Sequence, residues 1–137
     1  MNKRKGITGQ SLVEFMLIIP VVVFTITVFV DLGRAVFSYT VLSNAVREGT
    51  RYAVVHSLET SADQDLVIKA VKDTAEGLNP DKIIVTVTPP TAPSHIVTVH
   101  AKYTFSPVTP GLSLILGAGK NINLEAESSM EVAPLYQ

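Results

Sequence analysis

The chain has 137 residues, of which 17% are charged, with a formal net charge of −1 and no cysteine. A low charged fraction with positive mean hydropathy points away from intrinsic disorder and from nucleic-acid binding, which needs clustered surplus positive charge. The absence of cysteine excludes disulfides, thiolate zinc sites and a cysteine nucleophile. The length is sufficient for one small domain and, in addition, one apolar segment.

Residues 12–30 read LVEFMLIIPVVVFTITVFV and are predominantly apolar, with Glu14 as the only charge. This length is close to the roughly 20 residues that cross the hydrocarbon core of a bilayer. Lys3, Arg4 and Lys5 precede the segment, whereas the residues after it carry one acid and one base. The positive-inside rule therefore predicts a cytoplasmic N-terminus and an extracytoplasmic location for residues 31–137.

Two alternatives compete with a retained membrane helix. A cleaved secretory signal has a shorter apolar core, of about 7–15 residues, and small residues at its cleavage site. Gly33, Arg34 and Ala35 make a poor version of that site. A buried core helix is the second alternative, but a small domain rarely hides so long a helix that is apolar all round. We therefore favour a membrane helix.

Glu14 is the anomaly in this segment. A carboxylate inside a membrane helix costs about 2.5–3.5 kcal/mol on insertion scales, so such residues usually have a partner or a function. Glu14 lies near the cytoplasmic end, and reaching for the lipid headgroups is one explanation. Its neighbours offer another. The basic run, then Gly9, Gln10 and an apolar run containing the glutamate, resembles the processing site of type IV prepilins.

That resemblance implies cleavage by a prepilin peptidase between Gly9 and Gln10, which would place Glu14 at the fifth mature position. The free amine of a neighbouring helix could then neutralise the carboxylate and set the register between subunits. Removal of the basic leader would delete the charges that hold the segment in place. Pro20 lies within the segment and leaves the carbonyl of Met16 without its helical partner, which predicts a kink, either ordinary or functional.

The helical pattern continues beyond the apolar segment, since no proline occurs in residues 31–56. Apolar or small residues recur at helical spacing, at Leu32, Val36, Tyr39, Leu42, Val46, Gly49 and Ala53. One helix from about Gln10 to Val55 would be on the order of 70 Å long. Its first half is apolar all round and its second half is amphipathic, which predicts a stem that supports a soluble head.

Two groups of charges lie on the predicted stem. Asp31 and Arg34 can form a local ion pair where the chain leaves the lipid. Glu48 can pair with Arg51, but Arg47 and Arg51 repel each other. One arginine is therefore expected to find a carboxylate or carbonyl on the head or on another subunit, unless this face is simply solvated. We assign all five residues to subunit assembly.

The motifs GQSLVEFMLIIP and DLGRAVFSYTVLSNAVREGTRYA together resemble the TadE-like family, the pilin-like proteins of tight-adherence (Flp-type) type IV pilus systems. The matching positions are Val13, Glu14, Pro20, Asp31, Gly33, Arg34, Ala45, Arg47, Glu48, Gly49, Arg51 and Ala53. The resemblance covers about the first 55 residues. It implies a pilin-like fold and, as partners, copies of the chain or related pilins, a pilus assembly platform and membrane lipid.

The head begins with a predicted helix. Ser61 and Gln64 fit a capping box, and Gly77 and Pro80 are expected to end the helix. Its apolar face comprises Leu66, Val67, Ala70, Val71 and Leu78. Acids near its start, at Glu59, Asp63 and Asp65, lack the pattern of a calcium loop and suit compensation of the helix dipole.

Three strands with period-two alternation follow. Their inward sets are predicted to be Ile83, Val85 and Val87; Val97, Val99, Ala101, Tyr103 and Phe105; and Ile122, Leu124, Ala126, Ser128, Met130 and Val132. This pattern predicts an antiparallel sheet with its apolar side on the stem. The apolar segment with Leu112, Leu114, Ile115 and Leu116 would pack in the core, cover a sheet edge as a further element, or meet another subunit.

The sequence carries no local signature of catalysis. His56, His95 and His100 are the only histidines, and the last two have opposite parity on one predicted strand, so they cannot share a metal there. Nucleophile-elbow, phosphate-loop and zinc-protease motifs are absent. We therefore expect no catalytic residues, metal, cofactor, small-molecule substrate or nucleic acid, and an enzyme is the third and least favoured hypothesis.

The sequence predicts an α+β, type IV pilin-like chain with a long N-terminal helix, one further helix and a three- or four-stranded antiparallel sheet on the stem. Residues 1–9 form a leader, 10–30 the transmembrane helix, 31–56 the stem and 57–137 the extracytoplasmic head. The expected function is that of a non-catalytic pilin-like subunit in the cytoplasmic membrane, or on the cell surface once assembled. The alternative is an uncleaved single-pass protein that presents a small binding domain.

Overall fold

The computed structural model describes residues 7–56, 58, 60–91, 95–109 and 121–132. Its elements in chain order are α1 (Ile7–Val55), α2 (Ser61–Thr74), the 3₁₀ turn η1 (Pro80–Lys82), β1 (Ile83–Thr88), β2 (Ile96–Phe105) and β3 (Ile122–Glu131). This arrangement confirms the predicted α+β class, with a three-stranded sheet among the described residues. The segment with Leu112, Leu114, Ile115 and Leu116 lies outside the described residues.

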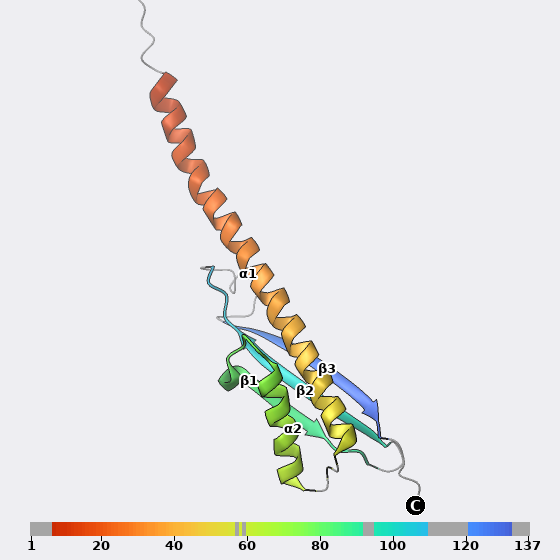
Figure 1. Ribbon diagram of the computed structural model, residues 1–137. Coiled ribbons are helices and arrows are strands. Elements are labelled where there is room, and N and C mark those ends of the chain that lie inside the picture. Colours follow the sequence, from red (N-terminus) through yellow and green to blue (C-terminus); the bar gives the residue numbers. More distant parts are fainter. Residues whose placement is uncertain (1–6, 57, 59, 92–94, 110–120, 133–137) are drawn as a thin grey trace, which may run out of the picture.

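α1 is one continuous helix of 49 residues. Figure 1 shows its N-terminal part standing clear of the head and its C-terminal part lying along the sheet. The amphipathic pattern explains this division, because the buried residues of α1 begin at Asp31 and then recur at helical spacing, with Leu42 and Val46 in the core. The predicted stem is therefore present as a direct extension of the apolar segment.

α2 is capped one residue earlier than the sequence predicted. Thr60, not Ser61, is the N-cap residue, because its hydroxyl accepts from the backbone N–H of Asp63 at 3.3 Å. The Asp63 carboxylate returns the contact by accepting from the backbone N–H of Thr60 at 2.9 Å. Ser61 is already helical, so the expected pairing with Gln64 is wrong in register. The helix ends at Thr74, and Gly77 follows with a φ of 83° in the turn.

The sheet has the order β1-β2-β3, and both pairs of strands are antiparallel. The predicted alternation is confirmed on β2, where Val97, Val99 and Ala101 are fully buried. Their side chains face the stem, and the intervening residues form the outer face of the sheet.

One hydrophobic core joins the two helices to the inner face of the sheet. α1 and α2 lie on the same side of the sheet (Figure 1), which gives the head a helix layer and a sheet layer. The helices approach closely at Gly49, where an added Cβ would collide with the Val71 side chain. Glycine at this position is therefore required by the packing of α1 against α2.

Candidate functional site

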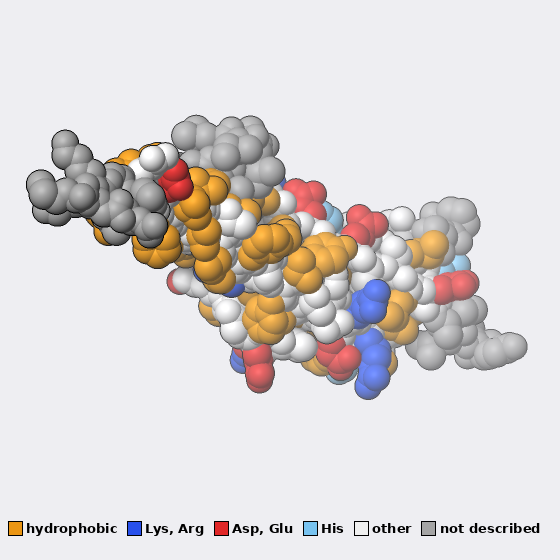
Figure 2. Space-filling model, turned by 90° about the horizontal axis from the view of Figure 1, so that it is seen from above, with side chains coloured by type: hydrophobic (Ala, Val, Ile, Leu, Met, Phe, Trp, Pro, Cys, Tyr) orange, Lys and Arg blue, Asp and Glu red, His pale blue; other side chains and the backbone are white. Residues whose placement is uncertain are grey.

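The first part of α1, residues 9–30, makes little contact with the rest of the described chain, and we call it the rod. The side chains of residues 9–26 are all exposed. The helix is long and apolar enough to cross a membrane. Apolar side chains cover the rod in the view of Figure 2. So large an apolar surface needs lipid or other apolar helices around it.

The two threonine hydroxyls of the rod are satisfied within the helix. Thr25 and Thr27 donate their hydroxyl hydrogens to the carbonyls of Val21 and Val23, both at 2.8 Å. Such back-bonding removes the cost of placing a hydroxyl in lipid. The helix runs through Pro20 without a break.

Glu14 presents its carboxylate on the surface of the rod. Its hydrogen bond comes from the Gln10 side-chain amide, which donates to the carboxylate at 3.2 Å, and both residues are exposed. Within the described ranges no cation forms an ion pair with Glu14. A neutral amide compensates a carboxylate far less than a cation does, so the group is available to a charged partner.

The expected cleavage site lies at the start of α1. The helix begins at Ile7, so the bond between Gly9 and Gln10 falls within its first turn. Apart from its chain neighbours and the helix backbone, no described atom lies within 4 Å of a Cβ built on Gly9. A protease that binds an extended substrate would have to open this turn, and helix ends fray readily.

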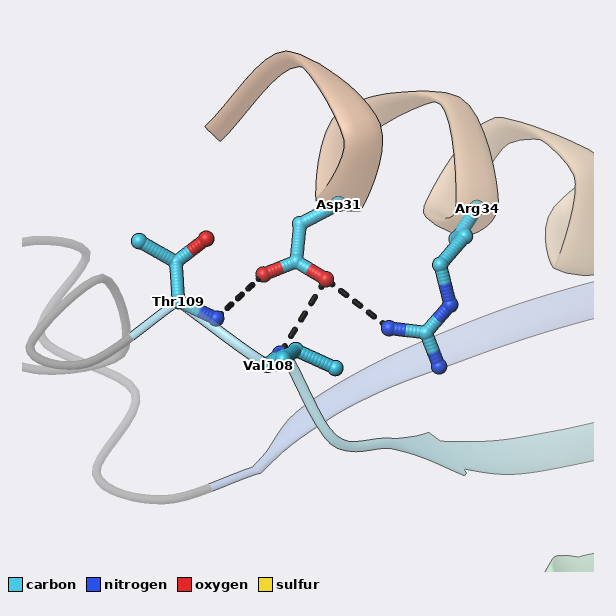
Figure 3. Close-up of polar contacts among 4 residues, drawn as sticks. All are labelled: Asp31, Arg34, Val108 and Thr109. Atoms are coloured by element: carbon cyan, nitrogen blue, oxygen red, sulfur yellow. Dashed lines mark hydrogen bonds and ion pairs between the residues drawn. The ribbon is translucent and has the colours of Figure 1, made fainter. Parts of the chain in front are cut away.

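Asp31 is buried at the point where the rod meets the head, with its side chain 1% exposed. Figure 3 shows its carboxylate between Arg34, one turn further along α1, and the chain that follows β2. Arg34 lies 2.8 Å away, which confirms the expected local ion pair. The backbone N–H groups of Val108 and Thr109 donate to the two carboxylate oxygens at 3.1 and 2.6 Å. We call these four residues the Asp31 junction.

The Asp31 junction holds a carboxylate in its charged form. Burial by itself raises the pKa of Asp31, but hydrogen bonds from Thr109, Val108 and Arg34 outweigh it and lower the pKa to about 2. The Arg34 guanidinium also lies over the Phe105 ring, 5.3 Å from its centroid. The junction therefore ties the end of β2 to the stem through charge-assisted contacts.

Sequence reasoning missed the loop side of this junction. The donors are backbone groups 77 and 78 residues away from Asp31. Every residue except proline has a backbone N–H, so residue type does not identify which ones act as donors. The predicted assembly role of Asp31 and Arg34 stays a prediction. The structure shows that Asp31 is fully engaged within its own chain, whereas the Arg34 side chain is 49% exposed.

The second group of charges lies on the outer side of the stem. Glu48 and Arg51 form the expected pair, but at 3.9 Å and with side chains 53% and 75% exposed it is a weak one. Arg47 is exposed and forms no ion pair with any residue that the structure describes. The stem therefore presents an arginine whose counter-charge does not lie in the described part of its own chain.

The histidines of the head lie on different structural elements. His95 is exposed and precedes β2, with a φ of 46°, whereas His100 lies on β2, 3.8 Å from Glu125. In the described parts of the chain no three metal-ligating side chains come together. The prominent surfaces are thus an apolar rod and a charged stem.

Comparison with known proteins identifies the same region. The family model described as TadE-like protein matches residues 9–51, which include the rod, the Asp31–Arg34 pair and the stem arginines. The sequence-based resemblance is confirmed over this stretch, which is less than half of the chain. No curated protein and no solved structure matches the chain. TadE-like proteins are pilus-associated proteins of tight-adherence systems, and the family is generally structural.

Proposed function

We propose that this chain is a non-catalytic pilin-like subunit of a tight-adherence type IV pilus system, either a minor pilin (pseudopilin) or a fibre subunit. The rod anchors it in the cytoplasmic membrane, with the head on the extracytoplasmic side. Processing after Gly9 by a prepilin peptidase and contact with the assembly platform precede packing with copies of itself or with related pilins. Assembly would carry the head to the cell surface.

The observation that carries this proposal is the exposed carboxylate of Glu14 on an otherwise apolar rod. In lipid this charge is costly, and its partner within the described chain is the neutral amide of Gln10. Cleavage before Gln10 would create a free amine one helical turn away from Glu14 on every copy. The amine of one rod could then neutralise the carboxylate of the next. Because an unpaired buried carboxylate is unfavourable, only the register that places the two groups together would be stable.

Removal of the leader also changes how firmly the rod is held. Lys3, Arg4 and Lys5 fix the cytoplasmic end while they remain attached. Without them, the remaining obstacle to leaving the bilayer is the apolar surface of the rod. Packing against similar rods covers that surface again, so the transfer from lipid into a bundle exchanges one apolar environment for another.

The alternative function is an uncleaved single-pass protein that presents the head as a binding domain. The favouring observation is that the head has its own core, built from α2, the sheet and the stem, without any contribution from the rod. In this case the rod would be a simple anchor and Glu14 would reach for the headgroups.

The mature N-terminus separates the two functions. Mass spectrometry of the protein isolated from membranes should show a chain that begins at Gln10. A Gly9→Leu variant, which blocks close approach of the protease to the backbone, should keep the leader. An intact leader on the assembled wild-type protein would contradict the pilin-like function.

Replacement of Glu14 tests the assembly role. We expect Glu14→Ala to reduce the amount of assembled protein by about tenfold or more, because the amine of the neighbouring rod loses its counter-charge. The melting temperature of the head should stay unchanged, since Glu14 makes no contact with it. Glu14→Gln, which keeps the shape and removes the charge, should resemble Glu14→Ala. Normal assembly of both variants would refute the role of the carboxylate.

A further inference from the structure

Two groups of charged side chains lie on the two broad faces of the head, a pair of arginines on α1 and a row of glutamates on β3. Arg47, Glu48 and Arg51 lie on the outer side of the helix layer, and we call them the stem arginine face. On the opposite layer, every second residue of β3 points outward, which exposes Glu125, Glu127 and Glu131 as an acidic stripe. Figure 2 shows red and pale blue side chains along the upper edge of the head, whereas the lower edge carries blue side chains together with red ones.

The two faces cannot neutralise each other within one chain. Leu42 and Val46 turn the inner side of the stem toward the sheet, and Ala126 lies on the inner face of β3. The arginines and the glutamates therefore point away from each other on the two sides of one core. Their pairing would require a second molecule.

Most of the charge on both faces is left without a strong partner in the described residues. On the acidic stripe, Glu125 lies 3.3 Å from Lys102, but Glu127 and Glu131 form no ion pair within the described ranges. On the stem, Arg47 forms none and Arg51 has only the exposed contact with Glu48 at 3.9 Å. Opposite charges that are unpaired on opposite faces favour a head-to-tail contact between copies.

The symmetry of the contact follows from the same charges. A two-fold contact would place the same face of both copies together, so that Arg47 would meet Arg47 or Glu127 would meet Glu127. Like charges placed together cost free energy, whereas the front of one copy against the back of the next pairs opposite signs. Such a repeat also lets all rods enter one membrane in the same direction.

We propose that the acidic stripe of one copy receives the stem arginine face of the next copy, so that heads stack helix layer against sheet. Arg47 then pairs with Glu127 of the neighbouring molecule, and Arg51 with Glu131 or Glu127. This contact rests on the proposed function, because it requires copies to stand side by side in one membrane. It adds a head contact to the packing of the rods.

Cysteine cross-linking of the full chain in membranes tests the contact, since the natural sequence has no cysteine. Asn44 is exposed one turn before Arg47, and Ser129 is exposed between Glu127 and Glu131. Co-produced Asn44→Cys and Ser129→Cys chains should form a disulfide-linked dimer on mild oxidation, and neither variant should do so alone. The double variant should form a ladder of trimers and larger species. Dimers from either single variant would indicate a two-fold contact and overturn the proposal.

A cysteine in the rod separates this proposal from the proposed function. Leu17 is exposed on the rod, so Leu17→Cys chains should cross-link wherever rods pack together. Cross-linking through Leu17→Cys without any between Asn44→Cys and Ser129→Cys would overturn the head contact and leave the pilin-like function standing. Absence of both cross-links would overturn both.

Charge reversal tests the pairing itself. Arg47→Glu or Glu127→Arg alone should lower the yield of the Asn44→Cys to Ser129→Cys cross-link by about tenfold, and the two reversals together should restore it. Lys69→Glu, at an exposed position on α2, is the matched control and should leave the yield unchanged. The melting temperature should not move in any of these variants. Failure of the double reversal to restore the cross-link would refute the pairing.

Discussion

The two halves of α1 are a single helix in two different environments. In the rod, residues 9–26 are exposed without exception, whereas in the stem Leu42, Ala45, Val46 and Ala53 are buried against the head. The rod is helical because its backbone hydrogen bonds are made within the helix. The stem is held in place because its apolar side chains pack in the core of the head. We therefore expect substitutions in the stem to affect the stability of the head and substitutions in the rod to leave it unchanged.

The largest difference in stability should appear between alanine variants of two leucines, one in the stem and one in the rod. Leu42 is 0% exposed and Leu17 is 69% exposed. We expect Leu42→Ala to lower the free energy of unfolding of the head by about 2–5 kcal/mol, because it leaves a cavity in the core. Leu17→Ala should change it by less than about 0.5 kcal/mol. Thermal unfolding in detergent, followed by circular dichroism, measures both. Equal losses would show that the rod contributes to the fold of the head.

Two glycines give the next contrast. An added methyl group at Gly49 collides with Val71, whereas nothing lies within 4 Å of a Cβ built on Gly33. Gly49→Ala should destabilise the head by about 1–3 kcal/mol through overpacking. Gly33→Ala should be neutral or stabilising by up to about 1 kcal/mol, because alanine favours the helix. Thermal unfolding measures both variants. A Gly49→Ala variant with the melting temperature of the wild type would mean that α2 can shift to make room for the methyl group.

The boundary between the halves should respond to pH. The pKa of Asp31 is about 2 in the folded chain, against an ordinary value of 3.8. The charged form is therefore favoured by folding, and this stabilisation is present above about pH 4 and lost as the pH falls toward 2. Its size is about 2 kcal/mol.

Asp31→Asn isolates this contribution. At neutral pH the variant should melt at a lower temperature than the wild type, and the gap should close between pH 4 and 2. Glu125→Gln is the control, because the contact of Glu125 with Lys102 is exposed and should contribute less than about 1 kcal/mol. A gap that stays constant down to pH 2 would mean that Asp31 does not titrate as described.

Local patterns were sufficient to predict most of the fold. The alternation in β2 and the helical spacing of the stem both report burial directly, and both appear as predicted. The capping box was misplaced by one residue because Thr60 and Ser61 are equally good N-cap residues by type. The sequence also indicated that one stem arginine lacks a local partner, and Arg47 is that residue among those described.

Contacts between distant backbone and side chain could not be predicted. The partners of Asp31 on the loop after β2 are N–H groups that any residue except proline could supply. The close approach at Gly49 is weakly indicated by the sequence, because Ala45, Gly49 and Ala53 are small residues spaced four apart. That spacing indicates a helix surface that another backbone can approach, although it does not identify α2 as the neighbour.

The sheet formed by the described residues has three strands, and their directions have a consequence for copies that share a membrane. Because β2 runs opposite to both neighbours, the edge strands β1 and β3 run in the same direction, along the stem (Figure 1). Joining β1 to β1, or β3 to β3, in an antiparallel manner would turn one molecule upside down and pull its rod out of the bilayer. Anchoring of the rod in the membrane thus prevents antiparallel pairing of identical edge strands, even at β1, whose edge carries no charge.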